Sequence, residues 1–157
     1  MLKSSLKASA GGLLLFVSMT VNALPRDYWP ANIEVFAPKS ELALYSKGYK
    51  GAAKVSLYEV DKLQRTEDRL SDLLPERFND PSMEAEAAKY MSTHHMDDIM
   101  AATPDMIDGW SVVVLASKYG LERVPATVFD GHLVVYGMAL PEAIREYQQY
   151  RYKQSRK

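Results

Sequence analysis

The fold is decided by one stretch of fourteen residues: Val124-Pro125-Ala126-Thr127-Val128-Phe129-Asp130-Gly131-His132-Leu133-Val134-Val135-Tyr136-Gly137. Asp130-Gly131 is typical of a two-residue hairpin turn, because both central positions of a type I′ turn need positive φ. The flanking residues 127–129 and 133–136 are β-branched, aromatic or aliphatic, which suits strands. Pro125 precedes the first strand, where a missing N–H disturbs the ladder least. The stretch therefore predicts an antiparallel hairpin led by a proline.

A strand–helix–strand unit is predicted upstream of the hairpin. Residues 33–37 alternate with apolar ends and indicate a strand, and Pro38 ends it. A helix follows, with Ser40 as its expected N-cap and Gly48 as its expected end. Residues 54–60 indicate a second strand. The short links predict a βαβ unit and therefore parallel pairing of the two strands.

Helical periodicity replaces the strand pattern between the second strand and the hairpin. Residues 61–102 are predicted to be a helical insert of two segments, the second of which starts at Asp80-Pro81. A crossing helix is expected from Pro104 to Tyr119. Its predicted inward stripe consists of Met106, Trp110, Val113, Val114 and Ser117.

The last predicted helix begins at Pro141. Its expected inward residues are Ile144 and Tyr147, and residues 151–157 form a basic tail.

The first 23 residues have the pattern of a cleaved signal peptide. Lys3 and Lys7 precede an apolar run over residues 8–21, and Val21-Asn22-Ala23 fits a cleavage site. The alternative is an uncleaved anchor, but the run is shorter than the ~20 residues that span a bilayer. We therefore expect cleavage after Ala23, a periplasmic location and no stable membrane insertion afterwards. Residues 24–32 would be an irregular lead-in.

The composition fits one globular domain and excludes thiol chemistry. The 157 residues are 47% hydrophobic and 25% charged, with a net charge of −1. Loss of two lysines with the signal peptide would leave −3, which does not indicate a nucleic-acid binder. The chain has no cysteine. Dithiol exchange and thiolate metal sites are therefore excluded.

The stretch 124–137 resembles the cis-proline hairpin of thioredoxin-like proteins. More closely, residues 124–130 and 134–137 resemble a family of exported proteins encoded in bacterial integrating conjugative elements. This resemblance implies a thioredoxin-like α/β fold over residues 33–150. The expected order is β-α-β, the helical insert at about 61–102, then α-β-β-α, with a mixed four-stranded sheet.

The resemblance also implies where a partner would bind. In thioredoxin-like proteins the reactive cysteine lies at the start of the first helix, and the residue before the cis-proline offers its backbone to an extended peptide. The matching positions give the candidate partner-binding residues Lys39, Ser40, Arg123, Val124 and Pro125. Ser40 is more simply a helix cap than a nucleophile. Equally, Pro125 could be only a rigid lead-in to its strand.

The function implied is that of a redox-inactive periplasmic binding or assembly accessory of a conjugative, type IV secretion apparatus. We expect protein partners from that apparatus, no cofactor and no enzymatic activity.

Two alternatives depend on other residues. His94-His95 with nearby carboxylates and methionines could bind copper or zinc, or serve a non-thiol enzyme. The strong metal-binding spacings are absent, and Met83, Met91 and His94 also fit an apolar helix stripe.

The tail mixes tyrosines with basic residues, as single-strand binders do. A helix with inward tyrosines and C-terminal cations explains the same pattern, so no nucleic-acid partner is expected. Docking of the tail on an acidic partner is an intermediate possibility.

For the protein as a whole, a purely structural subunit with a fixed partner is a further alternative.

Overall fold

Four strands form one mixed sheet in the computed structural model, which describes residues 28–47 and 49–156. Within these ranges the strands are β1 (Asn32–Ala37), β2 (Lys54–Glu59), β3 (Ala126–Phe129) and β4 (Leu133–Tyr136). The same ranges contain five α-helices: α1 (Lys39–Ser46), α2 (Lys62–Ser71), α3 (Glu84–His94), α4 (Met96–Lys118) and α5 (Leu140–Gln154). Two 3-10 turns, η2 (Glu76–Phe78) and η3 (Pro81–Met83), separate α2 from α3. The predicted α/β class with a mixed four-stranded sheet is confirmed.

Some predictions fall outside these ranges. They are the signal peptide at residues 1–23, the first part of the lead-in and the helix end at Gly48.

The sheet has the strand order β2-β1-β3-β4. β1 pairs in parallel with β2, with Val35 opposite Leu57, and antiparallel with β3, with Val35 opposite Thr127. β3 and β4 form the predicted hairpin. A short strand–helix–strand connection accounts for the β1–β2 pairing and a tight hairpin for the β3–β4 pairing, as the sequence patterns indicated. The β1–β3 pairing joins strands that are distant in the sequence.

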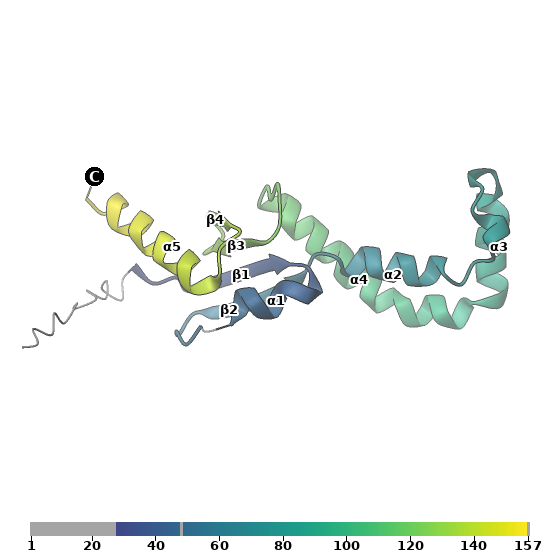
Figure 1. The fold of residues 1–157 in the computed structure, drawn as a ribbon, viewed down its shortest axis with the longest axis horizontal. Helices are drawn as coiled ribbons and strands as arrows, with labels where there is room; N and C mark the ends of the chain where they lie inside the picture. Colours follow the sequence, from purple (N-terminus) through teal and green to yellow (C-terminus); the bar gives the residue numbers. More distant parts are fainter. Residues whose placement is uncertain (1–27, 48, 157) are drawn as a thin grey trace, which may run out of the picture.

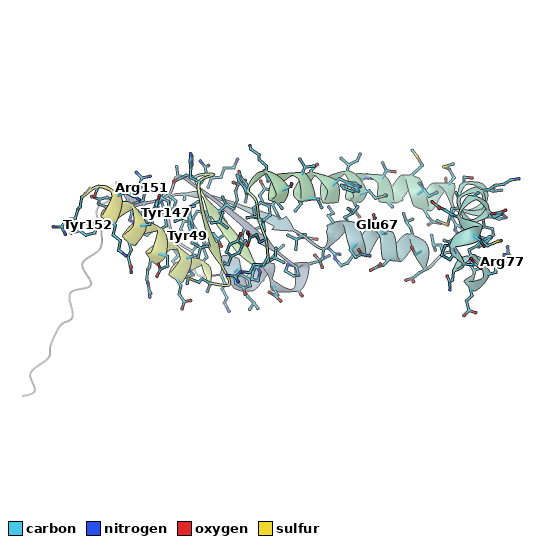
Figure 2. The ribbon with its side chains drawn as sticks, turned by 90° about the horizontal axis from the view of Figure 1, so that it is seen from above. Tyr49, Glu67, Arg77, Tyr147, Arg151 and Tyr152 are labelled. Carbon is cyan, nitrogen blue, oxygen red and sulfur yellow. The ribbon has the colours of Figure 1, made fainter. Side chains whose placement is uncertain are left out.

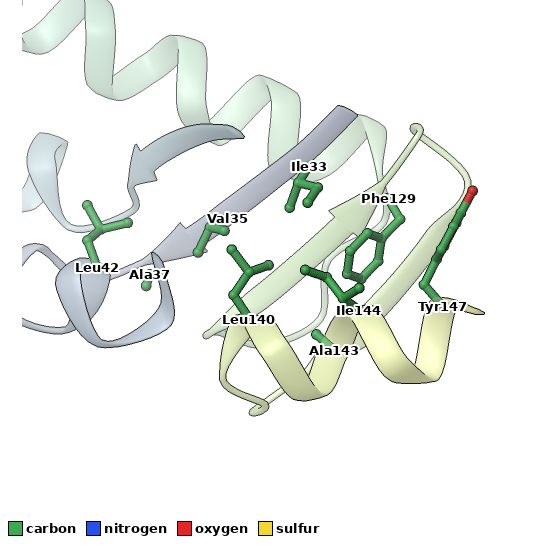
Figure 3. Packing of buried hydrophobic residues seen from close by; sticks show 9 residues of the cluster. All are labelled: Ile33, Val35, Ala37, Leu42, Phe129, Leu140, Ala143, Ile144 and Tyr147. Carbon is green, nitrogen blue, oxygen red and sulfur yellow. The ribbon is translucent and has the colours of Figure 1, made fainter. Parts of the chain in front are cut away.

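Apolar side chains of β1 alternate between two cores, one on each face of the sheet. Figure 3 shows the first core, in which α1 and α5 cover one face. Its buried members are Ile33, Val35, Ala37, Leu42, Phe129, Leu140, Ala143, Ile144 and Tyr147. The second core is smaller and lies under α4; its buried members are Phe36, Val112, Ala126 and Val128. The inward positions of Ile144 and Tyr147 are confirmed.

The molecule is elongated because the helical insert extends away from the sheet. In Figure 1 the sheet with α1 and α5 forms one end, and α4 runs from the sheet to the other end, where α3 lies. Figure 2 shows α2 and α4 side by side along this axis, with Arg77 at the end opposite to Tyr152. The insert is therefore an arm whose main contact with the sheet is α4.

The helix α4 is longer than predicted and begins before Pro104. Thr103-Pro104 does not start a helix: Pro104 lies inside α4, eight residues after its first residue Met96. An interior proline removes one backbone hydrogen bond and costs about 3 kcal/mol. Packing of α4 against α2 and α3 compensates, and Pro104 itself lies at an exposed position.

The face of α4 that packs inward is also different from the predicted one. The buried residues are Ala102, Gly109 and Val112, whereas Trp110 and Val114 of the predicted stripe are exposed. The reason is close packing against α2. A Cβ atom on Gly109 would lie 2.8 Å from both the backbone nitrogen and the Cβ of Leu63. Only a face of small residues permits this approach, so the large side chains point outward.

Ion pairs reinforce the contact between α2 and α4. The Lys62 ammonium lies 2.9 Å from a carboxylate oxygen of Asp108 and 3.2 Å from one of Asp105. Arg69 reaches the same Asp105 carboxylate at 3.7 Å. All are partly exposed, so they orient the two helices more than they stabilise them.

The hairpin turn is confirmed, and its aspartate has a second role. Asp130 has φ 50° and Gly131 has φ 71°, as a type I′ turn requires. One carboxylate oxygen of Asp130 accepts hydrogen bonds from the backbone N–H groups of Ala31 (2.9 Å) and Asn32 (2.8 Å). The other accepts one from the Tyr147 hydroxyl at 2.7 Å. Asp130 thus connects the turn, the start of β1 and α5.

Charge at Asp130 is stabilised by these contacts. Burial by itself raises the pKa of Asp130, but the hydrogen bonds from Tyr147, Asn32 and Ala31, with the nearby Arg151 cation, lower the pKa overall. The carboxylate therefore contributes stability in its ionised form.

Gly109→Ala is expected to destabilise the protein by about 1–3 kcal/mol, because the added Cβ meets the Leu63 backbone. Helix propensity alone predicts the opposite, a gain of about 1 kcal/mol. Urea unfolding measures the difference. Ser111→Ala, at an exposed position of the same helix, is the matched control and should change the free energy of unfolding by less than about 0.5 kcal/mol. A Gly109→Ala variant as stable as the wild type would contradict the close contact.

Asp130→Ala is expected to cost about 2–4 kcal/mol, because two backbone N–H groups and the Tyr147 hydroxyl lose their acceptor. Asp130→Asn tolerates the positive φ and keeps one acceptor oxygen, so its cost should be smaller. The folded-state pKa is lowered, so the stability due to the charge is complete above the unfolded pKa of ~3.9 and is lost as the pH falls through the folded pKa.

The stability gap between wild type and Asp130→Asn should therefore shrink when unfolding is measured below about pH 4 instead of at pH 7. A gap that does not depend on pH would show that the charge of Asp130 is not what stabilises the turn.

Candidate partner-binding site

The loop before β3 lies at the end of the sheet where β1 ends. Ala126 pairs with Phe36 on one side and with Tyr136 on the other, so the register places Val124-Pro125 next to Ala37 and Gly137. The Val124–Pro125 peptide bond is cis. The carbonyl of Pro125 accepts a hydrogen bond from the N–H of Gly137 at 2.9 Å, which fixes the loop to the end of β4.

Two of the predicted residues, Arg123 and Val124, line an apolar groove beside this loop. The groove has a volume of ≈ 450 Å³ and lies between the loop, the end of β2 and the second half of α4. Its other lining residues are Val60, Val112, Val113, Ala116, Ser117, Leu121 and Glu122. Aliphatic walls with charged residues at the loop give a surface on which an extended peptide could place an apolar side chain.

Val124 combines an exposed side chain with unpaired backbone groups. Its side chain is 43% exposed. Within residues 28–47 and 49–156, no hydrogen bond engages its backbone N–H or carbonyl. The neighbouring Arg123 guanidinium lies over the ring of Tyr136, 4.9 Å from the ring centroid. One donor and one acceptor are thus available for backbone pairing with another chain.

Lys39 and Ser40 form the first turn of α1, and neither lines the groove. The expectation that Ser40 caps this helix is wrong: the N-cap is Pro38, α1 begins at Lys39, and no side-chain cap is present. The backbone N–H of Lys39 instead donates to the Asp61 carboxylate at 2.9 Å. A residue distant in the sequence therefore satisfies the helix end in place of Ser40.

Lys39 lines a separate, polar pocket of ≈ 350 Å³ between α1 and α2. The other lining residues are Glu59, Lys62, Arg65, Thr66, Arg69 and Asp105. Arg65 pairs with Asp61 at 3.0 Å, and Lys62 and Arg69 pair with carboxylates of α4. Three of the four cations, Lys62, Arg65 and Arg69, are thus paired with carboxylates, and these ion pairs join the sheet to the arm.

A carboxylate held by two tyrosines lies beneath α4. The hydroxyl of Tyr119 donates to Glu34 at 2.7 Å, and that of Tyr58 donates to the other oxygen at 3.3 Å. The hydrogen bond to Glu34, together with burial, raises the pKa of Tyr119 to about 12. Tyr119 therefore stays protonated near neutral pH and donates the hydrogen bond that ties the end of α4 to β1.

The histidine pair makes local contacts. His94 stacks on Tyr90 with ring centroids 4.3 Å apart, and its Nδ1 lies 3.0 Å from the Tyr90 carbonyl oxygen. Nδ1 of His95 lies 3.0 Å from a carboxylate oxygen of Asp98. In the part of the chain that the structure describes, no three His, Cys, Asp or Glu side chains are grouped to hold a metal ion.

Most of the groove was not found from the sequence. The far wall of the groove forms only because α4 crosses the sheet with its small residues inward. That wall consists of Val112 and Ala116 on α4, with Val60 after β2 and Leu121 after α4. Val113 belongs to the predicted inward stripe of the crossing helix, but in the structure it is exposed and lines the groove. A pattern within one helix cannot indicate which of two apolar faces is covered.

Comparison with known proteins identifies a family. Residues 42–153 match the model of a family described as protein of unknown function, DUF1525. The matched range contains Arg123, Val124 and Pro125 but not Lys39 or Ser40. No curated protein matches this chain, and no solved structure matches it. Since the family model covers more than half of the sequence, this chain belongs to the DUF1525 family.

Proposed function

We propose that this protein is a redox-inactive, thioredoxin-like binding protein of the bacterial envelope. It would serve as an assembly accessory of a conjugative, type IV secretion apparatus, whose protein components would be its partners. The site of binding would be the loop Arg123–Pro125 and its apolar groove.

The thioredoxin-like part of the proposal is supported by topology. The strand order β2-β1-β3-β4, with one parallel and two antiparallel pairings, is the order expected of a thioredoxin-like core. Helices α1 and α5 cover one face and α4 crosses the other. The cis form of the Val124–Pro125 bond also supports this part of the proposal, because a cis-proline before the hairpin is expected of a thioredoxin-like protein.

The single observation that supports a binding function is the exposure of the Val124 side chain together with its unpaired backbone groups. Its side chain is exposed at the rim of the groove, and its N–H and carbonyl have no partner among the described residues. An extended segment can pair with these two groups and place an aliphatic side chain against Val60 and Val112. This mode of binding needs no catalytic side chain, which agrees with the absence of cysteine.

The periplasmic location and the conjugative role derive from the predicted signal peptide and from the resemblance of residues 124–137. In that location, an exported binding protein without redox residues could assist the assembly of the transfer apparatus.

Replacement of Val124 by a photo-crosslinking amino acid in donor cells tests this proposal directly. We expect cross-links to one defined component of the transfer apparatus. Val124→Asp should lower co-purification of that component and the transfer frequency by about tenfold or more, because it places a charge in an apolar groove.

Leu44→Asp is the matched control: Leu44 is 65% exposed on α1, across the sheet from the groove, and should leave both readouts unchanged. Equal circular dichroism melting of the two variants would confirm that both fold. Normal transfer and normal capture with Val124→Asp would refute the proposed site.

A further inference from the structure

The outer face of α4 carries a continuous apolar stripe. The exposed fractions are 49% for Met96, 64% for Met100, 61% for Ile107, 54% for Trp110 and 65% for Val114. These residues are separated by steps of 4, 7, 3 and 4 along the sequence, so they lie on one side of the helix. The opposite side, with Ala102, Gly109 and Val112, is buried. Helix α4 is therefore apolar on two faces, and only one of them is covered.

The stripe is large enough to form one half of an interface. Five large side chains exposed to about half or more present apolar surface on the order of 500 Å², near the largest patch of a typical monomer. A hollow of ≈ 570 Å³ along the stripe is lined by Ile107, Trp110, Ser111, Val114, Leu115 and Lys118. Stable complexes bury ~800 Å² per partner, most of which this stripe supplies.

We propose that the stripe binds a second copy of this chain, with the two α4 helices antiparallel about a twofold axis near Ile107. The spacing is that of a helix–helix seam: Met100, Ile107 and Val114 occupy position a of successive heptads, and Met96 and Trp110 occupy position d, with Thr103 at the d position between them. Met100 and Val114 lie seven residues on either side of Ile107, so antiparallel packing sets Met100 of one copy against Val114 of the other. The surface is then complementary to itself, as a twofold interface requires.

The charges beside the stripe select this orientation. Asp97 flanks its first residue and Lys118 follows its last, and neither forms an ion pair within residues 28–47 and 49–156. Antiparallel packing brings Asp97 of each copy near Lys118 of the other. Parallel packing would leave Asp97 and Lys118 at opposite ends of the interface, without this pairing. Opposed helix dipoles also favour the antiparallel arrangement.

A lipid bilayer fits the surroundings of α4 less well. By length and composition this helix is apolar enough to cross a membrane. Leaving its present position would, however, break the contacts of Gly109 with Leu63 and of Lys62 with Asp105 and Asp108. Helices that lie on membranes carry several Lys and Arg residues beside the apolar face, whereas α4 carries Asp97 and Asp108 there and a single cation, Lys118.

Sedimentation equilibrium of the purified protein tests the dimer. We expect a concentration-dependent dimer whose dissociation constant rises at least about tenfold in Ile107→Glu. Leu44→Glu, with a similar exposed fraction of 65% on α1, is the matched control and should dimerise normally. A protein that stays monomeric at all concentrations, or an Ile107→Glu variant that dimerises normally, would overturn the proposal.

Cysteine scanning tests the orientation, because the chain has no cysteine of its own. With oxidised glutathione as the oxidant, Ile107→Cys should cross-link to itself. Met100→Cys and Val114→Cys should cross-link when mixed and not when alone. Cross-linking of Met100→Cys with itself alone would indicate parallel packing and reject the model.

The Ile107→Glu variant also distinguishes two other ligands of the stripe, a lipid surface and a different protein. Flotation with phosphatidylethanolamine–phosphatidylglycerol vesicles that Ile107→Glu abolishes in a monomeric protein would assign the stripe to lipid. Loss of partner capture with Ile107→Glu from a monomeric wild type would assign it to a heterologous partner. Either result overturns the dimer, and neither depends on Val124.

Discussion

The close contact between α4 and its neighbours is the constraint on which the rest of the structure depends. Gly109 allows α2 to approach so closely that a Cβ atom would meet the Leu63 backbone, and Val112 follows on the same face to reach the second core. This one face of small residues joins the arm to the sheet. It also determines which side chains of α4 remain outside, and therefore shapes both the groove beside Val124 and the stripe around Ile107.

The sequence patterns predicted the sheet well because its signals are local. Alternation at β1, the Asp130-Gly131 turn and the apolar runs of β3 and β4 each depend on neighbours within a few residues. The helix starts were predicted less well. Thr103-Pro104 has a strong start signal, but tertiary packing keeps α4 continuous through it. Ser40 has the right chemistry for a cap, yet the Asp61 carboxylate takes a first-turn N–H of that helix.

The candidate site was predicted in part, for a similar reason. Arg123, Val124 and Pro125 are adjacent in the sequence and arrive together at the end of the sheet. Lys39 was placed beside them by analogy, but it lines the polar pocket at the junction with α2. The far wall of the groove comes from α4, and its identity depends on which apolar face of that helix is covered. No periodicity contains that information, because both faces have helical spacing.

The start of α1 shows what occupies the N-terminus of the first helix in a chain that has no cysteine. In thioredoxin-like enzymes the N–H groups and dipole of this helix stabilise a thiolate. Here the N–H of Lys39 is bonded to the Asp61 carboxylate, which Arg65 in turn holds at 3.0 Å. Under the proposed thioredoxin-like fold, the ionised Asp61 carboxylate would occupy the electrostatic role of that thiolate. At this end of the sheet the backbone N–H and carbonyl of Val124 form no hydrogen bond with the described residues, and backbone pairing is the interaction that they can still offer.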